Sequence, residues 1–151
     1  MSIYSDTNFI VRLYLEKPES GEARALMAEH RRCLPVFWLL RLEVINGIEQ
    51  SVFTGYGETR QRISHNLAAA CQQHFRDDLR EGIAMGMVDV PNAVLRRLVE
   101  DLSLRHTAKH GFRAYDLMHV AAALALKCKT FWSYDKRASI LAGLEGLKTF
   151  S

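Results

Sequence analysis

The sequence contains few cysteines and no long apolar run. Its three cysteines, Cys33, Cys71 and Cys128, are an odd number, lie far apart and form no Cys-x-x-Cys pair. A disulfide framework or a zinc site is therefore not expected. We expect reduced thiols in a cytoplasmic protein instead. The most apolar stretch, 117–126, is well short of the ~20 residues that span a bilayer. The first residues also lack the basic and apolar regions of a secretory signal. We expect a cytoplasmic protein that does not enter a membrane.

Two motifs of common enzyme classes are missing as well. The chain has no Gly-x-Ser-x-Gly nucleophile elbow and no phosphate-binding P-loop. A net charge of +3 and a pI near 8.9 permit a polyanionic partner such as a nucleic acid but do not require one. The composition, 48% hydrophobic and 25% charged over 151 residues, is that of an ordinary globular protein. It predicts a single domain, residues 1–151, with its own core.

Short apolar segments alternate with helical segments along the chain. The sequence predicts strands at 3–5, 33–36, 87–90 and 130–133, and a fifth edge strand at 147–150. It predicts helices at 9–15, 19–30, 38–52, 58–78, 91–110 and from residue 116 onward, with a short helix after residue 135. This alternation is typical of parallel βαβ units. We therefore expect an α/β fold, a three-layer α/β/α sandwich with a short, mainly parallel central sheet.

An aspartate opens the most apolar helix. In the run 116–126, the only polar side chain besides Asp116 is His119. A helix that is apolar on nearly every face is usually buried, and a buried carboxylate is costly unless a positive charge lies beside it. No Lys or Arg lies within the run. Asp116 is therefore either a charge at the exposed head of the helix, favoured by its dipole, or the ligand of a cation.

Three further acids stand in comparable places. Asp6 and Asp135 follow predicted strands, and sites in α/β sheets form at the carboxyl ends of strands. Glu43 shares the polar side of its helix with Asn46. Each also has a structural interpretation, as a helix cap for Asp6, a turn residue for Asp135 and a solvated surface residue for Glu43.

Together with Asp116, these acids point to metal chemistry. Converging carboxylates repel one another unless a hard cation neutralises them, and Mg²⁺ and Mn²⁺ prefer oxygen ligands. Such an ion can activate water for the hydrolysis of a phosphodiester without a nucleophilic side chain. The sequence therefore indicates a metal-dependent hydrolase.

The order of these motifs resembles the PIN-domain family, and within it the VapC-type toxins of bacterial toxin–antitoxin pairs. The resemblance covers nearly the whole length of the chain. It rests on the segments Tyr4-Ser5-Asp6-Thr7-Asn8, Leu42-Glu43-Val44-Ile45-Asn46, Tyr115-Asp116-Leu117-Met118-His119-Val120-Ala121-Ala122-Ala123 and Phe131-Trp132-Ser133-Tyr134-Asp135-Lys136-Arg137.

The resemblance implies an endoribonuclease that depends on Mg²⁺ or Mn²⁺, is inhibited by a cognate antitoxin protein and forms a homodimer. It implies that Asp6 and Asp116 hold the metal directly. It also implies that Glu43 and Asp135 hold the metal through water or orient the attacking water. The small polar residues that match supporting positions beside these acids are Thr7, Asn46 and Ser133.

Basic and aromatic residues near these motifs are candidate RNA contacts. Arg113, Lys136 and Arg137 are placed to hold RNA phosphates, with a solvated helix face as the alternative. The same basic approach to Asp116 includes Arg105, His106, Lys109 and His110. The aromatic residues considered for base stacking, with core or interface packing as the better assignment, are Trp38, Tyr56 and Phe75. His119 lies three residues after Asp116 on the same helix face, so a ligand or proton shuttle is one interpretation, and packing beneath the site is the favoured one.

Two other functions remain open at the level of sequence. The first is a magnesium-dependent phosphohydrolase of a small phosphorylated molecule, because such folds also place an aspartate after their first strand. The absence of a second aspartate two residues after Asp6 argues against it. The second is a non-catalytic, nucleic-acid-binding subunit in which the acids are structural.

Overall fold

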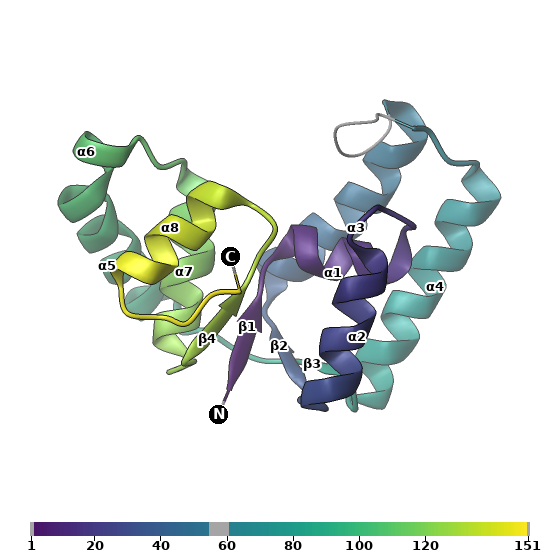
Figure 1. The fold of residues 1–151 in the computed structure, drawn as a ribbon, viewed down its shortest axis with the longest axis horizontal. Coiled ribbons are helices and arrows are strands. Elements are labelled where there is room, and N and C mark those ends of the chain that lie inside the picture. Colours follow the sequence, from purple (N-terminus) through teal and green to yellow (C-terminus); the bar gives the residue numbers. More distant parts are fainter. Residues whose placement is uncertain (1, 55–60, 151) are drawn as a thin grey trace. The chain divides into compact units, whose positions relative to one another are not determined.

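The computed structural model describes residues 2–54 and 61–150 (Figure 1). The chain divides into two compact units, which we call unit 1 (residues 1–6 and 88–151) and unit 2 (residues 7–87). Each is considered by itself. No helix of the described residues has the length and hydropathy needed to cross a membrane.

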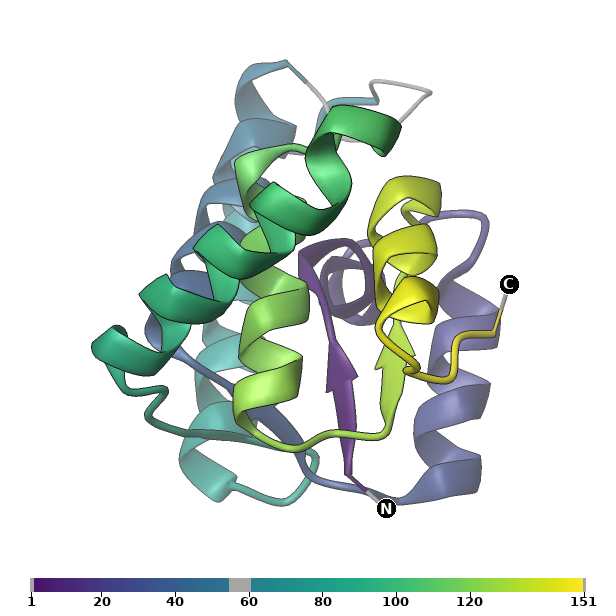
Figure 2. The same ribbon diagram turned by 90° about the vertical axis from the view of Figure 1, so that its left-hand side faces the viewer.

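Unit 1 is built on a pair of parallel strands. Its elements are β1 (Ile3–Ser5), α5 (Asn92–Leu102), the π-helical segment η1 (Ser103–Thr107), α6 (Ala108–His110), α7 (Ala114–Ala125), β4 (Thr130–Trp132) and α8 (Lys136–Leu144). β1 pairs with β4 from Ile3 opposite Thr130 to Ser5 opposite Trp132, and Figure 2 shows the two arrows pointing the same way. The predicted edge strand 147–150 is reduced to a single bridge between Thr130 and Lys148.

The core of unit 1 lies between this strand pair and its helices. α7 packs against α5 and α8, and α8 also contacts β4. Tyr4 and Phe131 are fully buried on adjacent strands, with their rings stacked at a centroid distance of 5.6 Å. α7 is buried along nearly its whole length, as its apolar run predicts. The predicted helix 91–110 instead comprises α5, η1 and α6 in succession, and Gly111 ends it in the left-handed region at a φ of 69°.

The described residues of unit 2 form a second parallel pair of strands and four helices. Its elements are α1 (Thr7–Tyr14), α2 (Ser20–His30), β2 (Leu34–Val36), α3 (Trp38–Phe53), α4 (His65–Glu81) and β3 (Met85–Met87). β2 runs parallel to β3, and α1 packs against α2, α3 and α4. Leu40, Val44 and Ile48 recur every four residues on α3 and are fully buried, which is the stripe that an amphipathic helix presents to a core.

Two predicted boundaries in unit 2 are wrong. The third strand lies at Met85–Met87 rather than 87–90, because the Leu34 N–H donates to the Ala84 carbonyl (2.9 Å) and sets the pairing earlier in the chain. Of the predicted helix 58–78, residues 58–60 lie outside the described part, and residues 61–64 are not helical. Ser64 instead caps α4, since its hydroxyl accepts the Leu67 N–H at 3.1 Å.

The predicted fold class is confirmed. Short parallel strands alternate with helices in both units, and each unit has a two-stranded parallel sheet among its described residues. The strands β1 and β4 end at Ser5 and Trp132, immediately before the motif residues Asp6 and Ser133. The carboxyl ends of the strands in unit 1 therefore carry two of the predicted site residues.

Candidate functional site

A buried hydrogen bond fixes how α7 packs against β1. The Tyr4 hydroxyl and His119 Nδ1 lie 2.8 Å apart, and both side chains are buried. His119 is thus a packing residue beneath the site, in agreement with its sequence interpretation. Sequence reasoning named this histidine but gave no partner for it, because Tyr4 lies 115 positions away in the chain.

The same contact places two acids at one end of the sheet. Asp6 lies two residues after Tyr4 and extends the ladder through its N–H to the Trp132 carbonyl (3.1 Å), so both side chains project to one side. Asp116 lies three residues before His119 and shares its helix face. α7 leads through a short link into β4, which is parallel to β1, so α7 runs antiparallel to both strands (Figure 2). Its first turn, with Asp116, therefore lies toward the carboxyl end of β1, where Asp6 follows.

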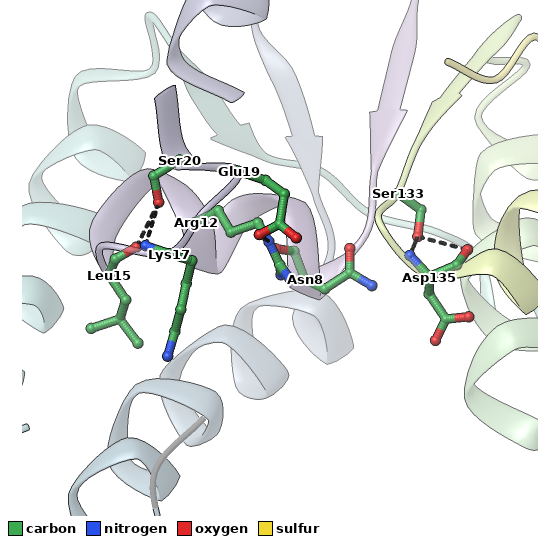
Figure 3. A network of polar contacts seen from close by, with 8 residues as sticks. All are labelled: Asn8, Arg12, Leu15, Lys17, Glu19, Ser20, Ser133 and Asp135. Atoms are coloured by element: carbon green, nitrogen blue, oxygen red, sulfur yellow. Dashed lines mark hydrogen bonds and ion pairs between the residues drawn. The ribbon is translucent and has the colours of Figure 1, made fainter. Parts of the chain in front are cut away.

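Ser133 links two of the acids. Asp6 is 4% exposed, and its Oδ2 accepts the Ser133 hydroxyl at 2.5 Å. The Ser133 Oγ in turn accepts the Asp135 N–H at 2.9 Å, as Figure 3 shows. One hydroxyl therefore orients the Asp6 carboxylate and holds the turn that carries Asp135. Ser133 thus contacts the side chain of Asp6 and the backbone of Asp135.

Asp116 is both a helix cap and a buried charge. Its Oδ2 accepts the Arg113 N–H at 3.1 Å, in the first turn of α7. This contact and the helix dipole stabilise a carboxylate there. Yet the side chain is only 9% exposed. Within the described residues no Lys, Arg or His pairs with it, and its Oδ1 accepts no hydrogen bond. Of the two sequence interpretations, the helix cap is present. The Asp116 carboxylate has no cationic side chain beside it among the described residues.

Asp135 is exposed and caps α8. Its Oδ1 accepts the N–H groups of Arg137 (2.8 Å) and Ala138 (3.3 Å). This is a structural role of the kind that short polar residues fill at helix N-termini. The second carboxylate oxygen, Oδ2, makes no hydrogen bond in the described part of the chain and is left for another ligand. The adjacent Lys136 is exposed, as is Arg137.

In unit 2, Glu43 is held by a threonine. The Thr7 hydroxyl donates to Glu43 Oε2, and the two half-buried side chains connect the start of α1 with α3. Asn46 lies one turn later on α3 and is exposed. Glu43 is therefore a fixed carboxylate and not a freely solvated surface residue.

The acids that lie within one unit do not by themselves form a complete metal cage. In neither unit do three or more His, Cys, Asp or Glu side chains of the described residues form a group that could hold a metal. The chemistry of Asp6 and Asp116 nevertheless fits a hard cation. Both are buried carboxylates, and Mg²⁺ is commonly held by one or two carboxylates while it keeps several waters.

The basic residues near α7 divide into two kinds. Glu145, at the end of α8, accepts Arg105 Nη2 at 2.8 Å and lies 2.8 Å from His106 Nε2. Burial acts to raise the pKa of Glu145, but the hydrogen bonds of His106 and Arg105 outweigh it and lower that pKa below its ordinary value. These two bases are therefore engaged inside unit 1. Arg113, like Lys136 and Arg137, is exposed.

An exposed tyrosine at the site was missed in the sequence. Tyr115 directly precedes Asp116 and is 60% exposed. The three aromatic residues considered for base stacking turn out differently, since Phe75 is fully buried, Trp38 is exposed on α3, and Tyr56 lies outside the described residues. The available signal was the position of Tyr115 in its motif, on a helix whose other faces are apolar.

Comparison with solved structures finds proteins of similar fold. The chain resembles the structure of VapC20 from Mycobacterium tuberculosis, described as a sarcin-ricin loop cleaving toxin, with a TM-score of 0.66 and 16% identity over 92% of this chain and 94% of that one. It also resembles FitAcB from Neisseria gonorrhoeae, with a TM-score of 0.57 and 14% identity over 99% and 96% of the two chains. No curated protein matches significantly.

These likenesses confirm the predicted PIN-like α/β fold. The sequence model of the PIN domain matches residues 3–144, which include all four predicted acids and span both units. The chain belongs to the PIN domain family.

Proposed function

We propose that the protein is a metal-dependent endoribonuclease of the VapC type, acting as the toxin of a toxin–antitoxin pair. The observation that carries the proposal is Asp116, a buried carboxylate with no basic partner among the described residues, at the same end of β1 as the buried Asp6. Membership of the PIN domain family supports it, as does the fold shared with VapC20, itself described as a sarcin-ricin loop cleaving toxin.

Asp6 and Asp116 would hold Mg²⁺ or Mn²⁺. The bound ion would supply positive charge beside the scissile phosphate and favour ionisation of the attacking water. The water oxygen would form the new bond to phosphorus while the bond to the leaving ribose oxygen breaks. The Ser133 hydroxyl keeps the Asp6 carboxylate oriented, and the free Oδ2 of Asp135 is available to orient water.

Glu43 is proposed as the fourth acid of the site. Its hydrogen bond to Thr7, the residue that follows Asp6 in the chain, supports this assignment. Asn46 would serve as a further polar contact on the same helix. Because one family model spans both units, we propose that residues 1–151 act as one PIN domain.

The proposed substrate is RNA, held at its phosphates by Arg113, Lys136 and Arg137, which are all exposed. The proposed protein partners are a cognate antitoxin and a second copy of the chain in a homodimer. Toxin and antitoxin would meet in the cytoplasm, where the RNA substrate is found.

The test is an Asp116→Asn variant assayed on total RNA in Mg²⁺ or Mn²⁺. The amide oxygen can still accept the Arg113 N–H, so the cap and the fold are retained while the charge is removed. Cleavage should fall by about 10³-fold or more, because a bound metal contributes several kcal/mol of charge stabilisation and each 1.4 kcal/mol is tenfold. Growth inhibition on expression should be lost in parallel.

Glu145→Gln is the matched control, because it also converts a carboxylate of unit 1 to an amide but at a residue paired with Arg105 and His106. It should cleave RNA at the wild-type rate. Wild-type cleavage by Asp116→Asn would contradict the mechanism. Hydrolysis of a small phosphomonoester without RNA cleavage would instead identify a phosphohydrolase. Absence of both activities in the wild type would identify a non-catalytic binding subunit.

A further inference from the structure

A surface cavity of unit 2 is lined mainly by arginines. It has a volume of about 250 Å³ and lies where α3 and α4 pack against each other (Figure 1). Its lining consists of Arg41 from α3, Arg76, Leu79 and Arg80 from α4, and Met87 from β3. Arg76 and Arg80 are four residues apart, so they share one face of α4. Among the described residues, no Asp or Glu lines this cavity.

The protein compensates little of the positive charge in this cavity. Arg41 is half-buried, and its guanidinium makes no hydrogen bond or ion pair within the described residues. Within the same part of the chain, Arg76 donates only to uncharged oxygens of the preceding turn, at 3.3 Å. Arg80 does pair with Asp77 at 2.9 Å, but its side chain is 74% exposed. Because exposed ion pairs are weak, all three guanidinium groups remain available to an anion.

The cavity is distinct from the contact that holds Glu43. Glu43 lies two residues after Arg41 and therefore about 200° around the helix, and its carboxylate binds Thr7 at the start of α1. Arg41 is thus not a counter-charge for the site acid proposed in unit 2. The unit as a whole has as many acidic as basic residues. The packing of α3 against α4, and not the composition, brings these arginines together.

Guanidinium groups that surround one cavity match the chemistry of a phosphate group. Each presents its N–H donors in a planar fork. A phosphate group offers several strong acceptor oxygens and up to two negative charges, so it can accept hydrogen bonds from all the arginines of the cavity at once. A carboxylate has fewer oxygens and a single charge, which one fork satisfies. A water needs only about 10–15 Å³ of cavity volume, so there is room for a phosphate group.

We propose that Arg41, Arg76 and Arg80 form a phosphate-binding site in unit 2. The phosphate belongs either to the backbone of an RNA or to a free phosphate compound, since the two sources present the same oxygens. The site needs neither a metal nor the proposed site acids. It therefore goes beyond the proposed ribonuclease function and is testable without RNA cleavage.

The first experiment titrates inorganic phosphate into the full-length protein in EDTA, so that no metal contributes, and measures binding by calorimetry. The wild type should bind phosphate saturably. Arg41→Gln should weaken binding by about 10- to 100-fold, because it removes hydrogen bonds to a charged group. Arg80→Gln changes a side chain that is too exposed to disturb folding, and it should also weaken binding. The matched control is Arg32→Gln, an exposed arginine of unit 2 outside the cavity lining, which should bind like wild type.

A second experiment identifies the source of the phosphate by measuring the affinity for a single-stranded RNA in EDTA over a range of salt concentrations. For an RNA backbone, Arg41→Gln should reduce the slope of log affinity against log salt by about 0.7, the value for one phosphate contact of a single strand. An unchanged slope, together with the loss of phosphate binding, would assign the site to a free phosphate compound.

Three results would overturn the inference. The first is a wild type that does not bind phosphate, and the second is phosphate binding by Arg41→Gln and Arg80→Gln at the level of Arg32→Gln. The third is a polyglutamate peptide that binds more tightly than phosphate and loses affinity in Arg41→Gln, which would assign the cavity to an acidic protein segment. Failure of phosphate binding would leave the proposed ribonuclease function standing, and absence of RNA cleavage would leave the phosphate-binding site standing.

Discussion

Glu19 in unit 2 pairs with a basic neighbour, whereas Asp116 in unit 1 has no basic partner among the described residues. Glu19 pairs with Arg12 at 2.8 Å, as Figure 3 shows, and that hydrogen bond is the main cause that lowers the pKa of Glu19. Asp78 accepts the Tyr14 hydroxyl at 2.5 Å, and burial together with Asp78 raises the pKa of Tyr14. Asp116, by contrast, accepts only a backbone N–H within the described residues.

Net charge separates the units in the same way. Unit 2 contains ten basic and ten acidic residues, counting Lys and Arg against Asp and Glu. Unit 1 contains ten basic and seven acidic residues, so the whole net charge of +3 belongs to the unit that also holds three of the four proposed site acids. A basic excess in the unit that holds Asp116, a buried acid without a basic partner among the described residues, suits a polyanionic substrate and a cation.

Glu145 shows that this contrast is not merely one of location in unit 1 or unit 2. It lies in unit 1, is largely buried, and is bound by both Arg105 and His106. A structural carboxylate in unit 1 is therefore paired just as Glu19 is in unit 2. The difference between Asp116 and Glu145 therefore lies in the missing basic partner and not in burial, and this is why Asp116 is the acid proposed to bind a metal.

The largest expected effect is on metal binding. Adding Mn²⁺ or Mg²⁺ should raise the melting temperature of the wild type, because a ligand that binds only the native state stabilises it by about 2.7 kcal/mol at 100 times its Kd. Asp6→Asn and Asp116→Asn should abolish this shift, and Glu145→Gln should keep it. Differential scanning fluorimetry over a metal titration measures all of these.

Two outcomes would alter the comparison between the units. An undiminished metal shift in Asp116→Asn would mean that its missing basic partner has no functional meaning. A metal shift that Glu43→Gln leaves unchanged would remove Glu43, the proposed site acid of unit 2, from metal binding. Without metal, Asp116→Asn should be as stable as wild type or more so, since it removes a buried charge that no cation compensates.

A smaller effect is expected from the paired acid of unit 1. The pKa of Glu145 is lowered in the folded protein, so its stabilising contribution is complete above the ordinary carboxyl pKa of about 4.5 and disappears as the pH falls through the lowered value. Glu145→Gln should lower the free energy of unfolding by about 1–2 kcal/mol at pH 6. This range lies between the stabilisation by an exposed ion pair and that by a hydrogen bond to a charged group.

Urea unfolding of wild type and Glu145→Gln from pH 7 to pH 3 measures this contribution. The difference between the two proteins should be constant above pH 5 and should shrink below pH 4.5. A difference that grows in acid would have the wrong sign for a lowered pKa, and would mean that the contacts with Arg105 and His106 do not stabilise the charged form.

Local signals in the sequence predicted the elements of the site well. The strand at 3–5 and the start of α3 at Trp38 match the structure, and the apolar run after Asp116 is the buried helix α7. These features depend on residues close together in the chain. The strand predicted at 87–90 was misplaced because the register of β2 against β3 is set by pairing between distant segments, which a local pattern does not contain.

The contacts that orient the candidate site residues also could not be predicted from local sequence patterns, because they join residues far apart in the chain. Ser133 donates to Asp6 across 127 positions, and His119 meets Tyr4 across 115. The motifs therefore named candidate site residues without identifying their partners. The sequence also left each acid with a structural alternative, and for Asp116 and Asp135 the structure contains that alternative, since both cap helices.

The smallest expected effect is on the free energy of unfolding, and it distinguishes a helix cap from a site residue. Ser64 caps α4 in unit 2 and Asp135 caps α8 in unit 1, each through side-chain acceptance of backbone N–H groups. Replacing either by Ala should lower the free energy of unfolding by about 1 kcal/mol in urea titrations. As structural elements, the two caps should be equivalent.

Asp135→Asn then divides the two roles of this residue. Asn caps helices about as well as Asp, so the variant should regain wild-type stability, while RNA cleavage should stay impaired because the free Oδ2 carboxylate oxygen has become an amide nitrogen. The corresponding Ser64→Asn should be stable and fully active. Wild-type cleavage by Asp135→Asn would make Asp135 a cap only, and the site acids of unit 1 would then be Asp6 and Asp116, the two that are buried.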